Sequence, residues 1–172
     1  GLPYYLKFKS HYPTVRDLAL APMDTVLRDW QGLGYYSRAR NLKATAELIH
    51  TQYGDVFPSK YDEILKLKGV GPYTAAAIAS FAFGESCAVV DGNVIRVLSR
   101  IFGIEAPFDT GAGKRAFDEK AALLIDKKNP ALYNQAIMDF GATVCVPKSP
   151  KCDCCPFSAN CFAYQKEMID AL

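Results

Sequence analysis

Four cysteines near the end of the chain have the spacing of a metal or cluster site. Cys145, Cys152, Cys155 and Cys161 follow the pattern C-x6-C-x2-C-x5-C. Four thiolates bind either a tetrahedral zinc ion or an iron–sulfur cluster. Structural zinc sites usually contain two close cysteine pairs and this arrangement has one, so the spacing favours a cluster without excluding zinc. Cys154 stands beside Cys155 and leaves the register of the pattern open.

A glycine-rich string between two helical stretches is suited to bind a phosphate. Within residues 67–75, Gly69 and Gly71 flank Val70, and Pro72 follows. Glycine lets a partner approach the backbone closely, and proline suits the first turn of a helix. The next N–H groups then face outward at the positive end of the helix dipole, which attracts anions. A helix–helix turn without any ligand has the same residue types and is the alternative.

An aspartate precedes a helical stripe of apolar residues. Asp91 is followed by Gly92 and Asn93, and the stripe runs over residues 94–101. An aspartate in this place is most often a helix N-cap. Capping and catalysis are compatible here, because a carboxylate held at a helix start is oriented and its negative charge is favoured. Such a group could stabilise a positively charged sugar from which a base departs.

Aromatic residues and glycines form a third motif. Gly32 and Gly34 indicate a loop, Tyr35 and Tyr36 follow, and Arg38 opens a helical stretch with further basic residues. Aromatic side chains beside a glycine turn, with basic residues after it, suit a wedge that enters stacked bases. Packing of the two tyrosines in the core is the alternative.

The elements that position these motifs are helices. Apolar residues recur with helical spacing along almost the whole chain, and only residues 87–90 show a short strand-like alternation. We therefore predict an all-α protein. The pattern suggests two helical lobes, residues 32–103 and residues 1–31 plus 104–172, with the cysteines at the end of the second.

Composition narrows the possible classes of protein. The net charge of +2 and a pI near 8.2 do not indicate a nucleic-acid binder, so a basic surface would have to come from local clustering. No apolar run reaches the length of a membrane span, and no signal peptide is visible. One tight cysteine cluster in a large apolar chain argues against a disulfide framework. It favours a reducing cellular compartment, in which the cysteines stay thiols.

The glycine string and the residues Val90-Asp91-Gly92-Asn93 together resemble the helix-hairpin-helix DNA glycosylase superfamily, which includes endonuclease III. The Asp-Gly-Asn-Val form resembles its MutY-type adenine glycosylases, and the likeness covers essentially the whole chain. It implies the helix-hairpin-helix glycosylase fold with two helical lobes and a C-terminal [4Fe–4S] loop. It also implies base excision repair, by hydrolysis of the N-glycosidic bond of adenine mispaired with 8-oxoguanine or guanine. The expected protein is a monomer on double-stranded DNA with an adenine mispair, without membrane contact, in the nucleoid-associated cytoplasm of a bacterium.

The resemblance assigns roles to individual residues. Asp91 matches the catalytic aspartate, Asn93 an asparagine that positions it and the attacking water, and Tyr73 a tyrosine that supports the catalytic carboxylates. Endonuclease III has a lysine where Tyr73 stands, and a tyrosine cannot form the Schiff base of that lyase reaction. The implied cluster ligands are Cys145, Cys152, Cys155 and Cys161. The implied DNA contacts are Leu33, Gly34, Tyr35, Arg38, Gly69, Val70, Gly71, Lys148 and Lys151, with a monovalent cation often bound at the hairpin.

Parts of the family pattern lie outside these residues. In MutY-type enzymes a catalytic glutamate lies on a helix just before the stretch that matches residues 2–5, and a domain that reads 8-oxoguanine follows the cluster. We therefore expect the 172-residue chain to bind DNA with little or no activity. Two alternatives stay open: another glycosylase branch acting on thymine mismatches or oxidised pyrimidines, and a non-catalytic DNA-binding module.

Overall fold

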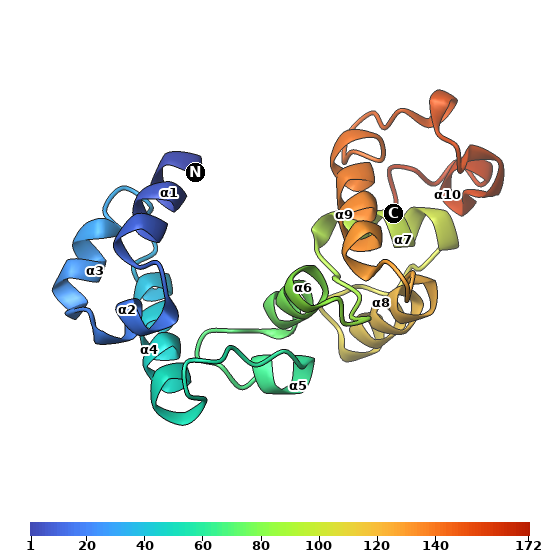
Figure 1. Cartoon of the computed structure of the whole chain (residues 1–172). Coiled ribbons are helices and arrows are strands. Elements are labelled where there is room, and N and C mark those ends of the chain that lie inside the picture. The colour runs from blue at the N-terminus through green and yellow to red at the C-terminus, as the bar shows by residue number, and fades with distance from the viewer. The chain divides into compact units, whose positions relative to one another are not determined.

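The computed structural model describes residues 1–172 and contains helices and loops but no β-strand (Figure 1). The all-α prediction is confirmed, and residues 87–90 form a loop. The chain divides into two compact units, residues 1–71 (unit 1) and residues 72–172 (unit 2). The boundary follows Gly71, inside the glycine string. The division into lobes 32–103 and 1–31 plus 104–172 stays a prediction.

Unit 1 contains five helices, of which α2 and α3 pack against α4. Their core consists of Leu18, Ala19, Val26 and Ala46, which are all buried. The start of α2 is set by a capping box, in which Thr14 Oγ1 accepts from the Asp17 amide and Asp17 accepts from the Thr14 amide. The helices are α1 (Leu2–His11), α2 (Val15–Leu20), α3 (Met23–Asp29), α4 (Ser37–Gln52) and α5 (Tyr61–Ile64).

The end of α3 is tied to α1 by one carboxylate. Asp29 lies 2.8 Å from His11 Nδ1 and from the Tyr12 hydroxyl, and 3.3 Å from Lys7 Nζ. Burial acts to raise the pKa of Asp29, but hydrogen bonds from His11, Tyr12 and Lys7 outweigh it and leave the pKa below its usual value. Burial and the hydrogen bond to Asp29 raise the pKa of Tyr12 to about 12. This cluster fastens the two helices just before Trp30, where the aromatic loop begins.

Unit 2 is built around α7, which packs against α8, α9 and α10. The helix begins after Asp91 and ends at Gly103, whose φ of +68° gives the left-handed C-terminal cap. Val94 and Leu98 pack with Phe117 of α8, as expected from the apolar stripe. The elements are α6 (Pro72–Phe83), α7 (Gly92–Phe102), α8 (Gly111–Leu124), α9 (Pro130–Thr143), the 3-10 turns η1 (Cys152–Cys154) and η2 (Ser158–Asn160), and α10 (Phe162–Gln165).

A buried asparagine holds the loop that leads to Asp91. Asn134 of α9 accepts a hydrogen bond from the Val89 amide at 3.1 Å and donates to the Cys87 carbonyl at 2.8 Å and to Ser80 Oγ at 3.0 Å. Only 1% of Asn134 is exposed. Because buried backbone groups need partners, this one amide substitutes for the regular pairing that the loop lacks.

We predict that Asn134→Ala lowers the free energy of unfolding by about 1–3 kcal/mol, since the Val89 amide and the Cys87 carbonyl would lose their buried partner. Urea denaturation measures this loss. The control is Gln135→Ala, on the same helix, because Gln135 is exposed and bonds only to Asp139. Equal midpoints for the two variants would contradict the role given to Asn134.

Candidate functional site

Asp91 caps α7 and stays accessible. Its Oδ1 accepts a hydrogen bond from the Val94 amide at 2.8 Å, and its Oδ2 accepts from the Asn93 side-chain amide at 3.0 Å. The residue is partly exposed, between the buried core and the surface. Both carboxylate oxygens are therefore oriented by the start of the helix, as the N-cap interpretation expects, while the group can still be approached from outside.

An arginine that the sequence did not single out fixes Asn93 from its other end. Arg96 Nη2 donates to Asn93 Oδ1 at 2.9 Å and to the Gly141 carbonyl at 2.7 Å, and Arg96 Nε donates to the Cys145 carbonyl at 2.8 Å. With its oxygen held by Arg96, the Asn93 amide must direct its N–H toward Asp91. Arg96 thus joins the start of α7 to the end of α9 and to the first of the four cysteines. The only feature of the sequence that could have indicated this role is the position of Arg96 one helical turn after Asn93, which places both side chains on the same face of the helix.

Helix α9 approaches this helix start so closely that only glycine fits. A Cβ added to Gly141 would lie 2.7 Å from Asn93 Cβ and 3.0 Å from the Asn93 carbonyl oxygen. The first distance is shorter than real Cβ contacts, and the second, to a backbone atom, is tighter than nine in ten of them. Gly141 therefore allows the approach on which the Arg96 hydrogen bond depends.

We predict that Gly141→Ala destabilises the protein by about 1–3 kcal/mol through overpacking against Asn93. Replacing a glycine inside a helix by alanine normally raises the free energy of unfolding by up to about 1 kcal/mol. The effect expected at Gly141 has the opposite sign. The matched control is Gly111→Ala in α8, where the nearest atom to an added Cβ is the far end of Arg115 at 3.9 Å. Thermal unfolding of both variants tests this, and a stabilised Gly141→Ala would contradict the close approach.

Tyr73 is not brought into hydrogen-bond contact with these groups. It lies in the first turn of α6, is 49% exposed, and bonds to neither Asp91 nor Asn93. Its supporting role stays a prediction from the resemblance.

The glycine string forms a tight turn before α6. Gly69 has φ +77°, and an added Cβ there would collide with the side chain of Asn41. The Val70 amide donates to the Leu67 carbonyl at 3.1 Å, while Gly71 is exposed. The first N–H groups of α6 have no acceptor inside their own helix, which leaves them for an external anion.

The aromatic loop projects a tyrosine from unit 1. Tyr35 is 84% exposed, so packing of Tyr35 in the core is wrong. The turn uses left-handed backbone at Gly32, Gly34 and Tyr35, with φ of +95°, +66° and +48°. Leu33 is half-buried, and its carbonyl accepts from Arg38 Nη2 at 3.1 Å. Leu33, Gly34 and Tyr35 therefore lie in one turn, and Arg38, in the first turn of α4, is hydrogen-bonded to it.

The four predicted cysteine ligands lie around one small cavity in unit 2. Cys145, Cys152, Cys155 and Cys161 all line it, whereas Cys154 is exposed and lies 3.5 Å from the Lys151 carbonyl. Burial raises the pKa of the Cys152 thiol, the three neighbouring cysteines raise it further, and Arg100 acts against them. The geometry thus distinguishes Cys155 from its neighbour.

Arg100 fastens the loop that carries the first cysteine. It is 3% exposed and donates to the carbonyls of Val146 at 2.8 Å and Pro147 at 3.1 Å. Its guanidinium also lies 3.7 Å from Cys145 Sγ. The following Lys148 and Lys151 are exposed and form no ion pair, so their charges are available to a partner.

The donor set fits a cluster better than a single metal ion. No three His, Cys, Asp or Glu side chains converge closely enough to hold one ion. The four thiols instead surround a shared space. A cluster accepts one thiolate on each of several irons, so its ligands stand further apart than those of zinc.

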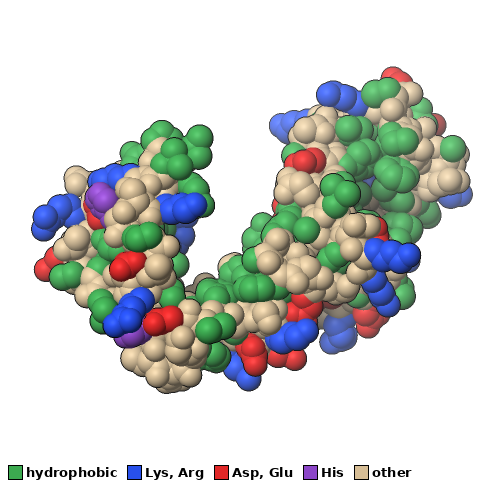
Figure 2. Space-filling view, in the orientation of Figure 1, with side chains coloured by type: hydrophobic (Ala, Val, Ile, Leu, Met, Phe, Trp, Pro, Cys, Tyr) green, Lys and Arg blue, Asp and Glu red, His purple; other side chains and the backbone are tan.

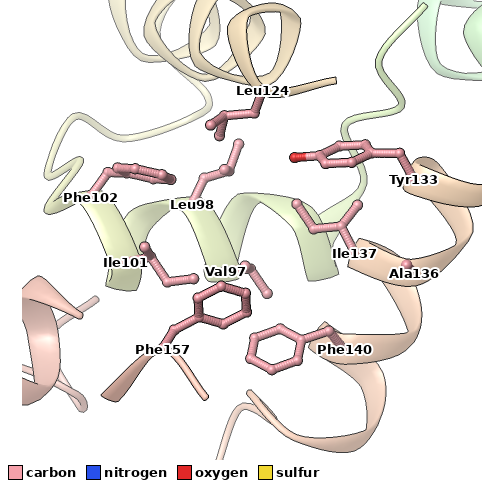
Figure 3. Close-up of a pocket in the computed structure, with 10 residues that line it drawn as sticks. All are labelled: Val97, Leu98, Ile101, Phe102, Leu124, Tyr133, Ala136, Ile137, Phe140 and Phe157. Atoms are coloured by element: carbon pink, nitrogen blue, oxygen red, sulfur yellow. The ribbon is translucent and has the colours of Figure 1, made fainter. Parts of the chain in front are cut away.

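A second, larger cavity of about 470 Å³ lies in unit 2 between α7, α8 and α9. Figure 3 shows its apolar side chains directed toward a common space, with the Tyr133 hydroxyl as the only polar atom drawn. It has no paired titratable groups, so it is not a site of acid–base chemistry. Its lining is Val97, Leu98, Ile101, Phe102, Leu124, Tyr133, Ala136, Ile137, Phe140 and Phe157.

On the face shown in Figure 2, charge is dispersed within each unit, and Lys and Arg side chains are interspersed with Asp and Glu. None of the helices has the length and apolar character needed to cross a membrane.

Comparison with known families and curated proteins gives a consistent result. The HhH-GPD model, which describes HhH-GPD superfamily base excision DNA repair proteins, matches residues 2–120. Adenine DNA glycosylase of Buchnera aphidicola subsp. Baizongia pistaciae is 37% identical over 167 residues, which are 95% of this chain and 46% of that protein. The enzyme of that name from Homo sapiens is 42% identical over 164 residues, covering 95% of this chain and 30% of that protein. The chain thus spans less than half the length of these relatives.

Solved structures agree in fold. A thermostable thymine-DNA glycosylase superposes with a TM-score of 0.85 at 34% identity, covering 95% of this chain and 76% of that one. Endonuclease III in a non-covalent complex with DNA superposes with a TM-score of 0.79 at 27% identity, covering 96% and 76%.

Proposed function

Because the chain belongs to the HhH-GPD superfamily of base excision DNA repair proteins, we propose that the complete protein hydrolyses the N-glycosidic bond of adenine mispaired with 8-oxoguanine or guanine. The observation that carries this proposal is the Asp91 carboxylate, oriented through both oxygens at a helix start yet partly exposed. The similarity to adenine DNA glycosylases supports the choice of base.

In the proposed reaction, Asp91 supplies negative charge where the sugar becomes cationic. The bond between C1′ and the base breaks, and its electron pair leaves with the adenine. Asn93 keeps the carboxylate in place and orients a water, whose oxygen then bonds to C1′ while its proton passes to the solvent. Preorganised charge of this kind stabilises a transition state because it needs no reorientation during the reaction. Protonation of the departing adenine is assigned to a glutamate that precedes these residues in MutY-type enzymes.

The proposed DNA contacts are of two kinds, an aromatic wedge that enters the base stack and groups that bind the DNA phosphate backbone. A stacked adenine is inaccessible, so the nucleotide must rotate out of the duplex at a cost of a few kcal/mol. Tyr35, with Leu33 and Gly34 beside it, would occupy the stack next to the orphan base, and Arg38 would approach the backbone. The amides around Gly69, Val70 and Gly71, together with Lys148 and Lys151, would hold phosphates.

The cysteines would hold a [4Fe–4S] cluster through Cys145, Cys152, Cys155 and Cys161. When bound, it would supply four metal–thiolate bonds that fasten the loop between the first and last ligand. A monovalent cation at the hairpin, a monomeric state and a nucleoid-associated cytoplasmic location stay predictions of the resemblance.

We predict that Asp91→Asn in the complete protein slows adenine release at least 100-fold, because the variant keeps the size of the side chain but loses its charge. The measurement is single-turnover release from a duplex with adenine opposite 8-oxoguanine. Binding to the same duplex should persist. A protein that only binds DNA would show no such release in either form.

Asp126→Asn is the matched control for this experiment. Asp126 also accepts from a backbone amide, that of Lys128 at 2.9 Å, and from an asparagine side chain, that of Asn129 at 3.0 Å. It lies before α9 rather than α7, so its loss should leave release unchanged. Equal slowing in both variants would remove the assignment of Asp91.

One alternative substrate class has a specific observation behind it, because a thymine-DNA glycosylase structure is among the similar folds. A panel of duplexes with adenine mispairs, a thymine mismatch and an oxidised pyrimidine decides between them. Excision of thymine or the pyrimidine in preference to adenine would replace the proposed substrate while leaving Asp91 as the catalytic group.

For the cluster, we predict that Cys155→Ser lowers the iron content and visible absorbance of the purified protein, whereas Cys154→Ser leaves both unchanged. The physical reason is that Cys155 lines the shared cavity and Cys154 is exposed outside it. Iron analysis and absorbance spectra give the readout. Stoichiometric zinc in place of iron, or equal losses in both variants, would refute the assignment.

A further inference from the structure

Trp30 makes two hydrogen bonds to the turn that carries Tyr35. Its indole N–H donates to the Gly34 carbonyl at 3.0 Å, and its own carbonyl accepts from the Leu33 amide at 3.1 Å. Trp30 follows the last residue of α3, which the Asp29 cluster ties to α1. The turn therefore starts from a fixed point.

The indole ring is itself held in place. Phe8 of α1 meets it edge-on, with ring centroids 5.7 Å apart. The Arg38 guanidinium lies 5.5 Å from the Trp30 ring centroid and 5.8 Å from that of Tyr35, within the range of cation–π attraction. Because Arg38 also donates to the Leu33 carbonyl, two consecutive carbonyls of the turn are held by these two side chains.

Tyr35 needs this support. Its φ of +48° is unfavourable for a residue with a Cβ, and its side chain is 84% exposed, so burial offers no compensation. Strained backbone of this kind persists only where surrounding contacts over-determine it. The hydrogen bonds on the Leu33 and Gly34 carbonyls are those contacts.

We propose that Trp30 is a positioning residue for Tyr35. Its indole N–H holds the turn of the free protein in the conformation in which Tyr35 binds DNA. The inference rests on the proposed function, in which Tyr35 enters the base stack. A turn ordered in advance loses less conformational freedom on binding, so the preset tyrosine should strengthen binding to the mispair.

The test variant is Trp30→Phe, which keeps an aromatic ring for Phe8 and Arg38 but lacks the N–H. We expect roughly 3- to 10-fold weaker binding to a duplex with an adenine mispair, the fold-change of one lost hydrogen bond. Affinity for an undamaged duplex should not change. In a Tyr35→Ala background, Trp30→Phe should have no further effect, because a residue that acts through Tyr35 is silent without it.

Thr14→Ala is the control for general loosening of unit 1. It removes the capping box at the start of α2 and leaves the turn intact, so it should alter stability but not the preference for a mispair. If Trp30→Phe weakens binding equally with and without Tyr35, the indole acts on the whole unit and the inference is overturned.

A measurement without DNA separates this inference from the proposed function. In the free protein, the backbone amide of Tyr35 should show a lower NMR order parameter in Trp30→Phe than in the parent, while the amides of α4 are unchanged. An unchanged Tyr35 amide would overturn the inference. The other outcome is that this amide becomes more mobile while Tyr35→Ala leaves binding to the mispair intact. In that case Trp30 does order the turn, and the proposed insertion of Tyr35 into the base stack is refuted.

Discussion

The arrangement of unit 2 depends on one side chain whose N–H groups reach three acceptors within 2.9 Å. Arg96 holds the Asn93 amide oxygen, the carbonyl at the end of α9 and the carbonyl of Cys145. An arginine serves here because its planar fork carries several donors in a fixed geometry. The consequence is that the carboxylate of Asp91, the last turn of α9 and the start of the cysteine loop keep a common position.

Close packing makes that position possible. Gly141 removes the one side chain that would separate α9 from the start of α7, and Asn134, two turns earlier on the same helix, anchors the loop before Asp91. One helix therefore supports the candidate catalytic group from both sides. Neither residue has a chemical role of its own, yet the orientation of a charge toward a reacting sugar is set by such supports.

In unit 1, the side chain that must be oriented is Tyr35, which lies at the surface. An exposed aromatic side chain such as Tyr35, which under the proposed function enters a stack of bases, cannot be held by burial. The turn around Tyr35 instead relies on Trp30 and Arg38, which occupy the carbonyls beside it, and on α1, which packs behind the indole. In both units, the groups that the proposed function directs toward DNA are oriented by hydrogen bonds from neighbouring side chains.

Short-range features could be read from the sequence. The N-cap at Asp91, the glycine turns at Gly34 and Gly69, the helical character and the cysteine spacing each depend on a few neighbouring residues. Tertiary structure alone decided that Cys155 and not Cys154 faces the shared cavity, and that Arg96 reaches carbonyls 45 and 49 residues further along the chain. The reason is physical: caps and turns are set by local backbone geometry, whereas these contacts exist only once α7 and α9 have packed together.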